Sequence, residues 1–137
     1  ELAATYDKSI QFWADIALSK PDIIPKLPEK ATALIWGYES GYPFGKRAET
    51  LAQAGVPYYV CPSTSSWSTF GGRTLNTIAN QYEAIEGAID HGATGYLVTT
   101  WGDNGHMQPE FVSSLGYLVA ASLSWNQNTK KPNQQIY

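Results

Sequence analysis

Short apolar runs recur along the chain and have the composition of buried β-strands. They are rich in aromatic and β-branched residues, and glycine or proline stands close to most of them. On this pattern we expect strands over Ser9–Ile16, Thr32–Trp36, Val56–Cys61 and Thr94–Thr99. The polar tail from about residue 126 carries little pattern of either kind.

Segments with helical character follow each of these runs. In the longest, Thr74 is expected to cap a helix that runs to about His91, with Gly92 just past its end. Its apolar residues recur at helical spacing: Leu75, Ile78, Ala79, Tyr82, Ile85 and Ile89. The remaining helices are expected near Asp22–Lys26, over Lys46–Ala54 and over Phe111–Ser124, with Trp125 in the core.

Strand and helix therefore alternate four times, which predicts an α/β fold with a parallel sheet and crossover helices. Four β/α units make half of a (β/α)₈ barrel or a small doubly wound sheet. A complete barrel needs about 250 residues, and this chain has 137. We treat residues 1–137 as one domain. An unrelated flavodoxin-like domain, which would bind a cofactor, stays open on the alternation alone.

The amino-acid composition argues against some classes of binding partner and favours one. The formal net charge is -3, so the chain has no basic field to attract a nucleic acid. No apolar run approaches the ~20 residues that span a bilayer. Cys61 is the only cysteine, which excludes an intrachain disulfide. Five Trp and nine Tyr exceed what a core of this size needs, and their flat apolar faces with polar edges suit a carbohydrate.

The candidate chemistry lies just past the strands, where ligands meet parallel sheets and barrels. Trp36, Trp67 and Trp101 follow three successive expected strands. Asp103 and Glu39 could accept hydrogen bonds from sugar hydroxyls beside them. Trp rings with a few carboxylates form a reasonable sugar pocket. The two histidines have too few companion ligands to indicate a metal site.

At these residues the sequence resembles a known family. Trp101–His106, after a Gly-Tyr-Leu strand, resembles the last barrel strand of the bacterial family 20 glycoside hydrolases, the β-N-acetylhexosaminidases. Three further segments resemble that family's fifth, sixth and seventh strands, in order: Phe12–Ile16, Trp36–Glu39, and Cys61–Trp67 with Gly72, Arg73 and Asn76. The resemblance covers nearly the whole chain and implies the C-terminal half, strands five to eight, of a (β/α)₈ barrel.

The resemblance implies a retaining hydrolysis of terminal N-acetylglucosamine or N-acetylgalactosamine in which the substrate's acetamido oxygen is the nucleophile. An Asp–Glu pair after the fourth strand supports that reaction in the family. The chain contains no Asp–Glu dipeptide. We therefore assign no catalytic residue, cofactor or metal, and expect the chain alone to be inactive. The parent enzyme of such a half-barrel would be secreted or periplasmic.

What carries over is the pocket. By resemblance, Trp36, Trp67 and Trp101 would wall the sugar, and Trp13 is a further wall. Tyr58 or Tyr59 would hydrogen-bond the acetamido oxygen, and Asp103 would hold ring hydroxyls. Glu39 completes the expected substrate-binding set, and Cys61 would lie in the pocket floor. Two positions depart from the family: Thr100 stands where relatives often have Asp, and Ser63 where they often have Gly.

The expected partners follow from an open half-barrel. Its two unpaired sheet edges invite pairing, so we expect either the missing N-terminal half or a second copy of the chain, together with an N-acetylhexosamine-containing glycan. The alternative is a carbohydrate-binding or structural half-barrel without catalysis. Neither a nucleic acid nor a membrane is expected as a partner.

Overall fold

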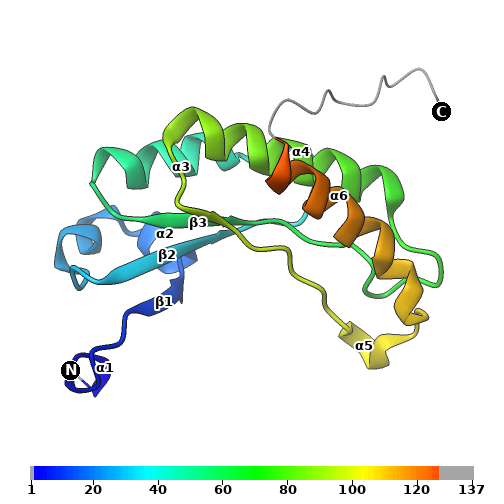
Figure 1. Cartoon of the computed structure of the whole chain (residues 1–137), viewed down its shortest axis with the longest axis horizontal. Coiled ribbons are helices and arrows are strands. Elements are labelled where there is room, and N and C mark those ends of the chain that lie inside the picture. Colours follow the sequence, from blue (N-terminus) through cyan, green and yellow to red (C-terminus); the bar gives the residue numbers. More distant parts are fainter. Residues whose placement is uncertain (1, 127–137) are drawn as a thin grey trace.

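The computed structural model describes residues 2–126 and contains a four-stranded parallel sheet with helices between the strands (Figure 1). The strands lie in chain order, β1-β2-β3-β4. The elements are α1 (Leu2–Thr5), β1 (Ile10–Trp13), α2 (Asp15–Ser19), η1 (Pro21–Lys26), β2 (Ala31–Trp36), α3 (Phe44–Gln53), β3 (Tyr58–Cys61), α4 (Thr74–His91), β4 (Gly95–Tyr96), α5 (Asp103–His106), η2 (Glu110–Ser113) and α6 (Ser114–Trp125).

The predicted α/β class and the alternation of strand and helix are confirmed. Parallel pairing joins all neighbouring strands, with Trp13 beside Leu34, Leu34 beside Tyr59, and Tyr59 beside Gly95. Strands β1, β3 and β4 are shorter than the apolar runs that predicted them, whereas β2 begins one residue earlier than expected, at Ala31. The first run was wrong at its end: β1 stops at Trp13, and Asp15 already begins α2, where a carboxylate stabilises the first helical turn.

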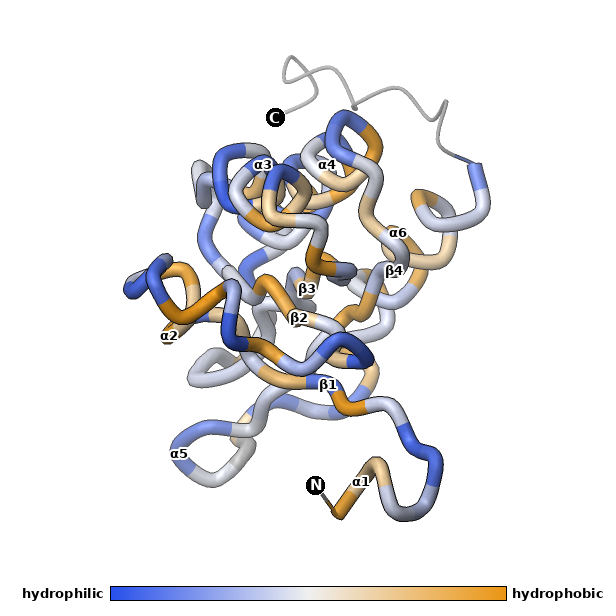
Figure 2. Tube along the Cα trace, turned by 90° about the vertical axis from the view of Figure 1, so that its left-hand side faces the viewer, coloured by the Kyte–Doolittle hydropathy of each residue, from blue (hydrophilic) through white to orange (hydrophobic). Residues whose placement is uncertain are grey.

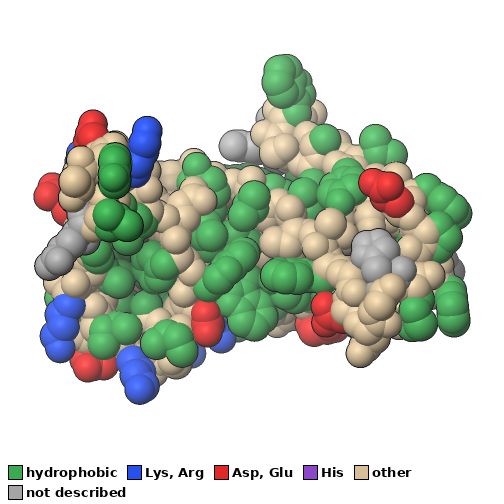
Figure 3. Space-filling view, turned by 90° about the horizontal axis from the view of Figure 1, so that it is seen from below, with side chains coloured by type: hydrophobic (Ala, Val, Ile, Leu, Met, Phe, Trp, Pro, Cys, Tyr) green, Lys and Arg blue, Asp and Glu red, His purple; other side chains and the backbone are tan. Residues whose placement is uncertain are grey.

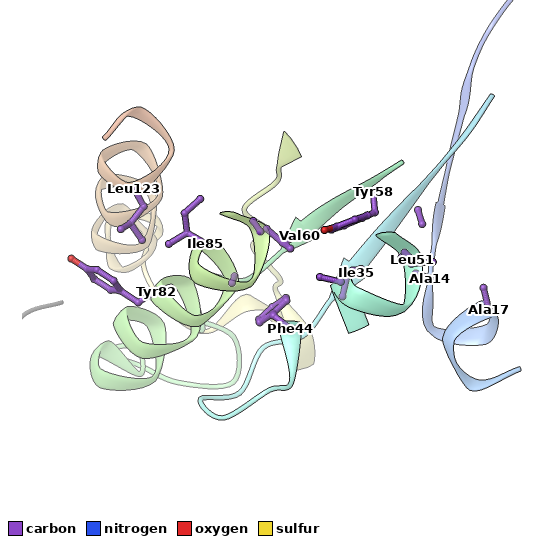
Figure 4. Packing of buried hydrophobic residues seen from close by; sticks show 14 of the residues in the cluster. Ala14, Ala17, Ile35, Phe44, Leu51, Tyr58, Val60, Tyr82, Ile85 and Leu123 are labelled. Carbon is purple, nitrogen blue, oxygen red and sulfur yellow. The ribbon is translucent and has the colours of Figure 1, made fainter. Parts of the chain in front are cut away.

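Helices α3, α4 and α6 lie on one side of the sheet, and α5 lies on the other side in both views (Figures 1 and 2). Alternate strand residues point to the helices and form the core. In the register, Ala33 lies beside Tyr58, where the small residue makes room for the large one, and Ile35 lies beside Val60. All four belong to one buried cluster with side chains from α2, α3, α4 and α6 (Figure 4).

The opposite face of the sheet has no layer of helices over it among residues 2–126. Hydrophobic side chains gather along this side of the molecule (Figure 3). Register places Trp13, Leu34 and Tyr59 in one row across the face, with Trp36 and Cys61 in the next row. Trp13 is 42% exposed. The tail from 127 on lies outside the described residues.

The ends of helices α4 and α6 test two predictions made from the sequence. Gly92 ends α4 in the left-handed conformation at φ 74°, as expected for a glycine cap. The expectation that Trp125 lies in the core was wrong, because its side chain is 92% exposed at the end of α6. The residues of α6 that face the core include Ala120 and Leu123. Apolar residues occur on every side of this helix, so the sequence pattern did not show which side faces the core.

Gly87 allows α4 to touch the start of α3. A Cβ at Gly87 would lie 2.8 Å from the Gly45 nitrogen and 3.1 Å from the Phe44 carbonyl carbon. We predict that Gly87→Ala destabilises the fold by about 1–3 kcal/mol through overpacking. Gly71→Ala is the matched control, because a Cβ there meets nothing within 4 Å. Urea unfolding of both variants measures the difference, and equal stabilities would contradict this packing.

Candidate functional site

Aromatic side chains from several elements meet at the carboxyl edge of the sheet. Tyr38 lies at the centre of the cluster. Its ring centroid is 5.2 Å from that of Trp36, 5.4 Å from Trp67 and 6.3 Å from Trp101. Trp36 ends β2, Tyr38 follows it, and Trp67 and Trp101 follow β3 and β4; parallel strands bring such segments to one edge. We call Trp36, Tyr38, Trp67 and Trp101 the aromatic cluster.

A pocket of ≈ 340 Å³ opens beside this cluster and is lined by Trp13, Asp15, Trp36, Tyr38 and Trp101. Asp15 is the first residue of α2, and its Oδ1 accepts a hydrogen bond from the Trp36 indole at 3.3 Å. This bond fixes the edge of the Trp36 ring and leaves the second carboxylate oxygen as an acceptor. The volume lies within the range of about 300–1,000 Å³ that is usual for small-molecule sites.

A larger hollow of ≈ 440 Å³ lies near the other end of the sheet, where Gly95 begins β4. It is lined by Ile85, Ala88, Ile89, Gly92, Ala93, Thr94, Gly95, Tyr96 and Ser124. None of these side chains is charged, although Thr94, Tyr96 and Ser124 give the hollow a more polar lining than the smaller pocket has. The smaller pocket, with its rings and carboxylate, is the better candidate site.

The backbone that carries Tyr38 is held by polar side chains of α4. Buried Asn80 donates from Nδ2 to the carbonyls of Gly37, at 3.1 Å, and Glu39, at 3.0 Å, and its Oδ1 accepts from the Ser63 amide at 3.2 Å. Asn76 donates to the Tyr38 carbonyl at 2.7 Å. The loop after β2 is therefore fixed both to α4 and to the segment after β3.

The Tyr38 hydroxyl adds a polar group to the aromatic cluster. Burial raises the pKa of Tyr38, although hydrogen bonding with Trp101 and Thr99 opposes this effect, and the Asp103 charge adds to it. Tyr38 is therefore a neutral hydroxyl at physiological pH, able to donate and accept hydrogen bonds. Asp103 itself is exposed at the start of α5, which lies on the uncovered side of the sheet.

Four expected site residues lie outside the pocket lining: Glu39, Tyr58, Trp67 and Asp103. Glu39 forms a bidentate ion pair with Arg73, with contacts of 2.7 Å and 2.5 Å. Tyr58 faces the helices, where its hydroxyl donates to the His91 carbonyl at 2.8 Å. Trp67 contacts Tyr38 from the loop after β3 without lining the pocket. Of the two tyrosines considered, Tyr59 is the one that shares the uncovered face with Leu34.

Sequence reasoning missed Tyr38 and Asp15 as site residues. Both stood within motifs that the resemblance used, each two residues after a tryptophan. For Tyr38 the available signal was its position just past a predicted strand, whereas Asp15 fell inside the predicted strand Ser9–Ile16. Cys61 was expected in the pocket floor and is completely buried. Burial raises the pKa of its thiol to about 12, so it is not a thiolate nucleophile at neutral pH.

Comparison with known sequences does not identify the chain: neither protein-family models nor curated proteins give a match. Over residues 2–126, no group of three or more His, Cys, Asp or Glu side chains is placed to hold a metal ion. Within the same residues, no helix is long and apolar enough to cross a membrane.

The Glu39–Arg73 pair predicts a specific pH dependence. Hydrogen bonding from Arg73 lowers the pKa of the Glu39 carboxyl from its ordinary value of 4.5. A lowered folded-state pKa contributes stability above the unfolded value, and that contribution is lost as pH falls through the folded value. We predict that Glu39→Gln lowers the unfolding free energy by less than about 1 kcal/mol at neutral pH, since the pair is exposed.

The difference between wild type and Glu39→Gln should shrink as pH falls below about 4. Denaturant unfolding at a series of pH values measures it. Glu29→Gln is the control, because Glu29 lies before β2, at the opposite end of that strand from Glu39. Parallel pH profiles for wild type and Glu39→Gln would show that the ion pair does not form in solution.

Proposed function

We propose that this chain is the sugar-binding half of a β-N-acetylhexosaminidase barrel. The observation that carries the proposal is the pocket walled by Trp13, Trp36 and Trp101 around Tyr38, with Asp15 at its rim. Aromatic faces stack on the apolar C–H faces of a sugar ring, and the carboxylate accepts hydrogen bonds from its hydroxyls. The resemblance of the strand-end motifs to family 20 narrows the sugar to an N-acetylhexosamine.

The reaction would be substrate-assisted retaining hydrolysis, in which this chain supplies binding and orientation. No Asp–Glu dipeptide occurs in the 137 residues, so the acid and the residue that orients the acetamido group would come from another segment. A non-catalytic carbohydrate-binding half-barrel is the second candidate, favoured by that same missing pair. The two candidates share the pocket and differ in whether a catalytic half joins it.

The margins of the sheet support a half-barrel that needs a partner. In the described structure β1 and β4 are the outer strands, each paired on one side only. Large exposed apolar side chains stand at both margins: Ile10, Trp13 and Ile16 at one, and Leu97 just past β4 at the other. Four more β/α units would bury both sets and close the sheet, which removes its edges.

Sugar binding is tested by titrating the chain with N-acetylglucosamine and following tryptophan fluorescence. We predict a saturable change, with Kd raised at least about tenfold by Tyr38→Ala, a loss of about 1.4 kcal/mol. Trp125→Ala is the matched control, because that exposed ring lies outside the pocket and should leave Kd unchanged. A wild-type chain that shows no saturable response would contradict the proposal.

Association through the two margins of the sheet is tested by sedimentation of the isolated chain. We predict self-association, reduced towards monomer by Ile16→Glu and by Leu97→Glu, because a charge at either margin prevents burial. Leu75→Glu is the control, since Leu75 is similarly exposed but lies at the start of α4, between the two margins. A monomer at every concentration, or equal effects of all three variants, would contradict a partner at these margins.

A further inference from the structure

Four side-chain hydroxyls form a closed ring behind the aromatic cluster. Thr64 Oγ1 lies 3.1 Å from Thr100 Oγ1 and 2.9 Å from Ser66 Oγ. Ser113 Oγ closes the ring, at 2.8 Å from Ser66 Oγ and 3.3 Å from Thr100 Oγ1. The four residues come from the segment after β3, the segment after β4 and η2. We call them the hydroxyl ring.

The ring has one consistent direction. Thr64 is the donor in its bond to Thr100, while either atom can donate in the bonds Thr64–Ser66, Ser66–Ser113 and Thr100–Ser113. Each hydroxyl has a single proton. Thr100 then donates to Ser113, Ser113 to Ser66, and Ser66 back to Thr64. Every proton is used once within the ring, and aligned hydroxyls of this kind strengthen one another.

The backbone around the ring is bonded independently of it. The Thr64 amide donates to the Thr99 carbonyl at 2.9 Å, and the Thr64 carbonyl accepts from Thr77 Oγ1 at 2.6 Å. The Ser66 carbonyl accepts from Thr69 Oγ1 at 2.8 Å. The ring hydroxyls are therefore not needed to satisfy these main-chain groups. Their bonds serve instead to fix three segments at set distances from one another.

Helix α6 holds the fourth member in place. A Cβ at Gly116 would lie 2.8 Å from Thr64 Cα, so the start of α6 presses directly on the Thr64 residue. Ser113 immediately precedes this helix and is buried. Thr64 and Ser66 are buried as well, whereas Thr100 is exposed at the mouth of the sheet. Three buried hydroxyls and a close helix contact leave little freedom to the ring.

Two of the ring members directly precede walls of the aromatic cluster. Ser66 is followed by Trp67 and Thr100 by Trp101, and both tryptophan rings approach Tyr38. We propose that the hydroxyl ring is a positioning element that sets the orientation of Trp67 and Trp101 towards Tyr38. Its use in sugar recognition rests on the proposed function, whereas the positioning itself is a property of the chain without ligand.

The decisive variant is Thr100→Val, which keeps the shape of the side chain and removes its hydroxyl. We expect it to lose roughly half of the near-ultraviolet circular dichroism, because Trp67 and Trp101 no longer keep a fixed angle to Tyr38. Thr100→Ser restores a hydroxyl and should restore the signal. Thr94→Val is the matched control, since its hydroxyl bonds to the Tyr58 carbonyl at the opposite end of the sheet. A full signal in Thr100→Val overturns the proposal.

A second measurement needs no variant, so it holds even where Thr100→Val fails to fold. Hydroxyl-proton exchange in the wild-type chain is followed by NMR. The ring predicts that the protons of Ser66 and Ser113 exchange far more slowly than those of exposed hydroxyls such as Ser124, which is outside the ring. Exchange at the rate of Ser124 overturns the proposal.

The sugar titration separates this inference from the proposed function. If the wild-type chain binds no sugar while Thr100→Val loses the aromatic signal, the positioning role stands and the sugar proposal fails. If the wild-type chain binds N-acetylglucosamine and Thr100→Val keeps both its signal and its Kd, the sugar proposal stands and the positioning role is overturned. A raised Kd in Thr100→Val, restored in Thr100→Ser, supports both.

Discussion

The candidate site depends on one buried carboxamide, that of Asn80. A polar group without solvent exposure must find partners inside the protein, and Asn80 finds three: the carbonyls of Gly37 and Glu39 and the amide of Ser63. It thereby ties α4 to the ends of two neighbouring strands. Without these bonds, the backbone that follows each strand end would not be held against α4. The same helix contributes Asn76, so one rigid element controls the backbone on either side of Tyr38.

The site that results relies on shape more than on charge. Its walls are indole and phenol rings, and neither residue of the exposed Glu39–Arg73 ion pair belongs to the pocket lining. The pair instead bridges the loop after β2 to the residue before α4. A ligand for this pocket therefore needs a flat apolar face and hydroxyl donors for the carboxylate of Asp15. These requirements favour a neutral sugar over an anion.

The uncovered face connects the pocket to the proposed barrel. In a closed barrel the row of Trp13, Leu34 and Tyr59 would lie in the interior, and layers of such side chains fill barrel interiors. The exposed apolar residues of both margins would be buried by the same closure. If the proposed barrel forms, burial of apolar surface would account for the exposed margins and the uncovered face of the sheet together.

The sequence by itself determined the α/β class, the four β/α units and the gathering of tryptophans at one edge, because each depends on local periodicity and chain order. It also located the long helix α4, although the expectation that Thr74 caps it was wrong: Thr74 is the first helical residue and Arg73 occupies the cap position. It did not reveal which strand face is buried, and so it could not separate Tyr58 from Tyr59. Alternation assigns neighbouring residues to opposite faces, but only the position of α3 and α4 decides which face is inside.

Partners across the chain were likewise decided by tertiary structure. The carboxylate of Glu39 suited a sugar hydroxyl, but in the structure Arg73, 34 residues away in the sequence, donates hydrogen bonds to both of its oxygens. Trp36 was expected as a wall, and its indole bond to Asp15 appears only once β1 and β2 lie side by side. Tyr38 became the centre of the cluster because three strand ends converge on it. Such choices depend on distances in space, which residue spacing along the chain does not encode.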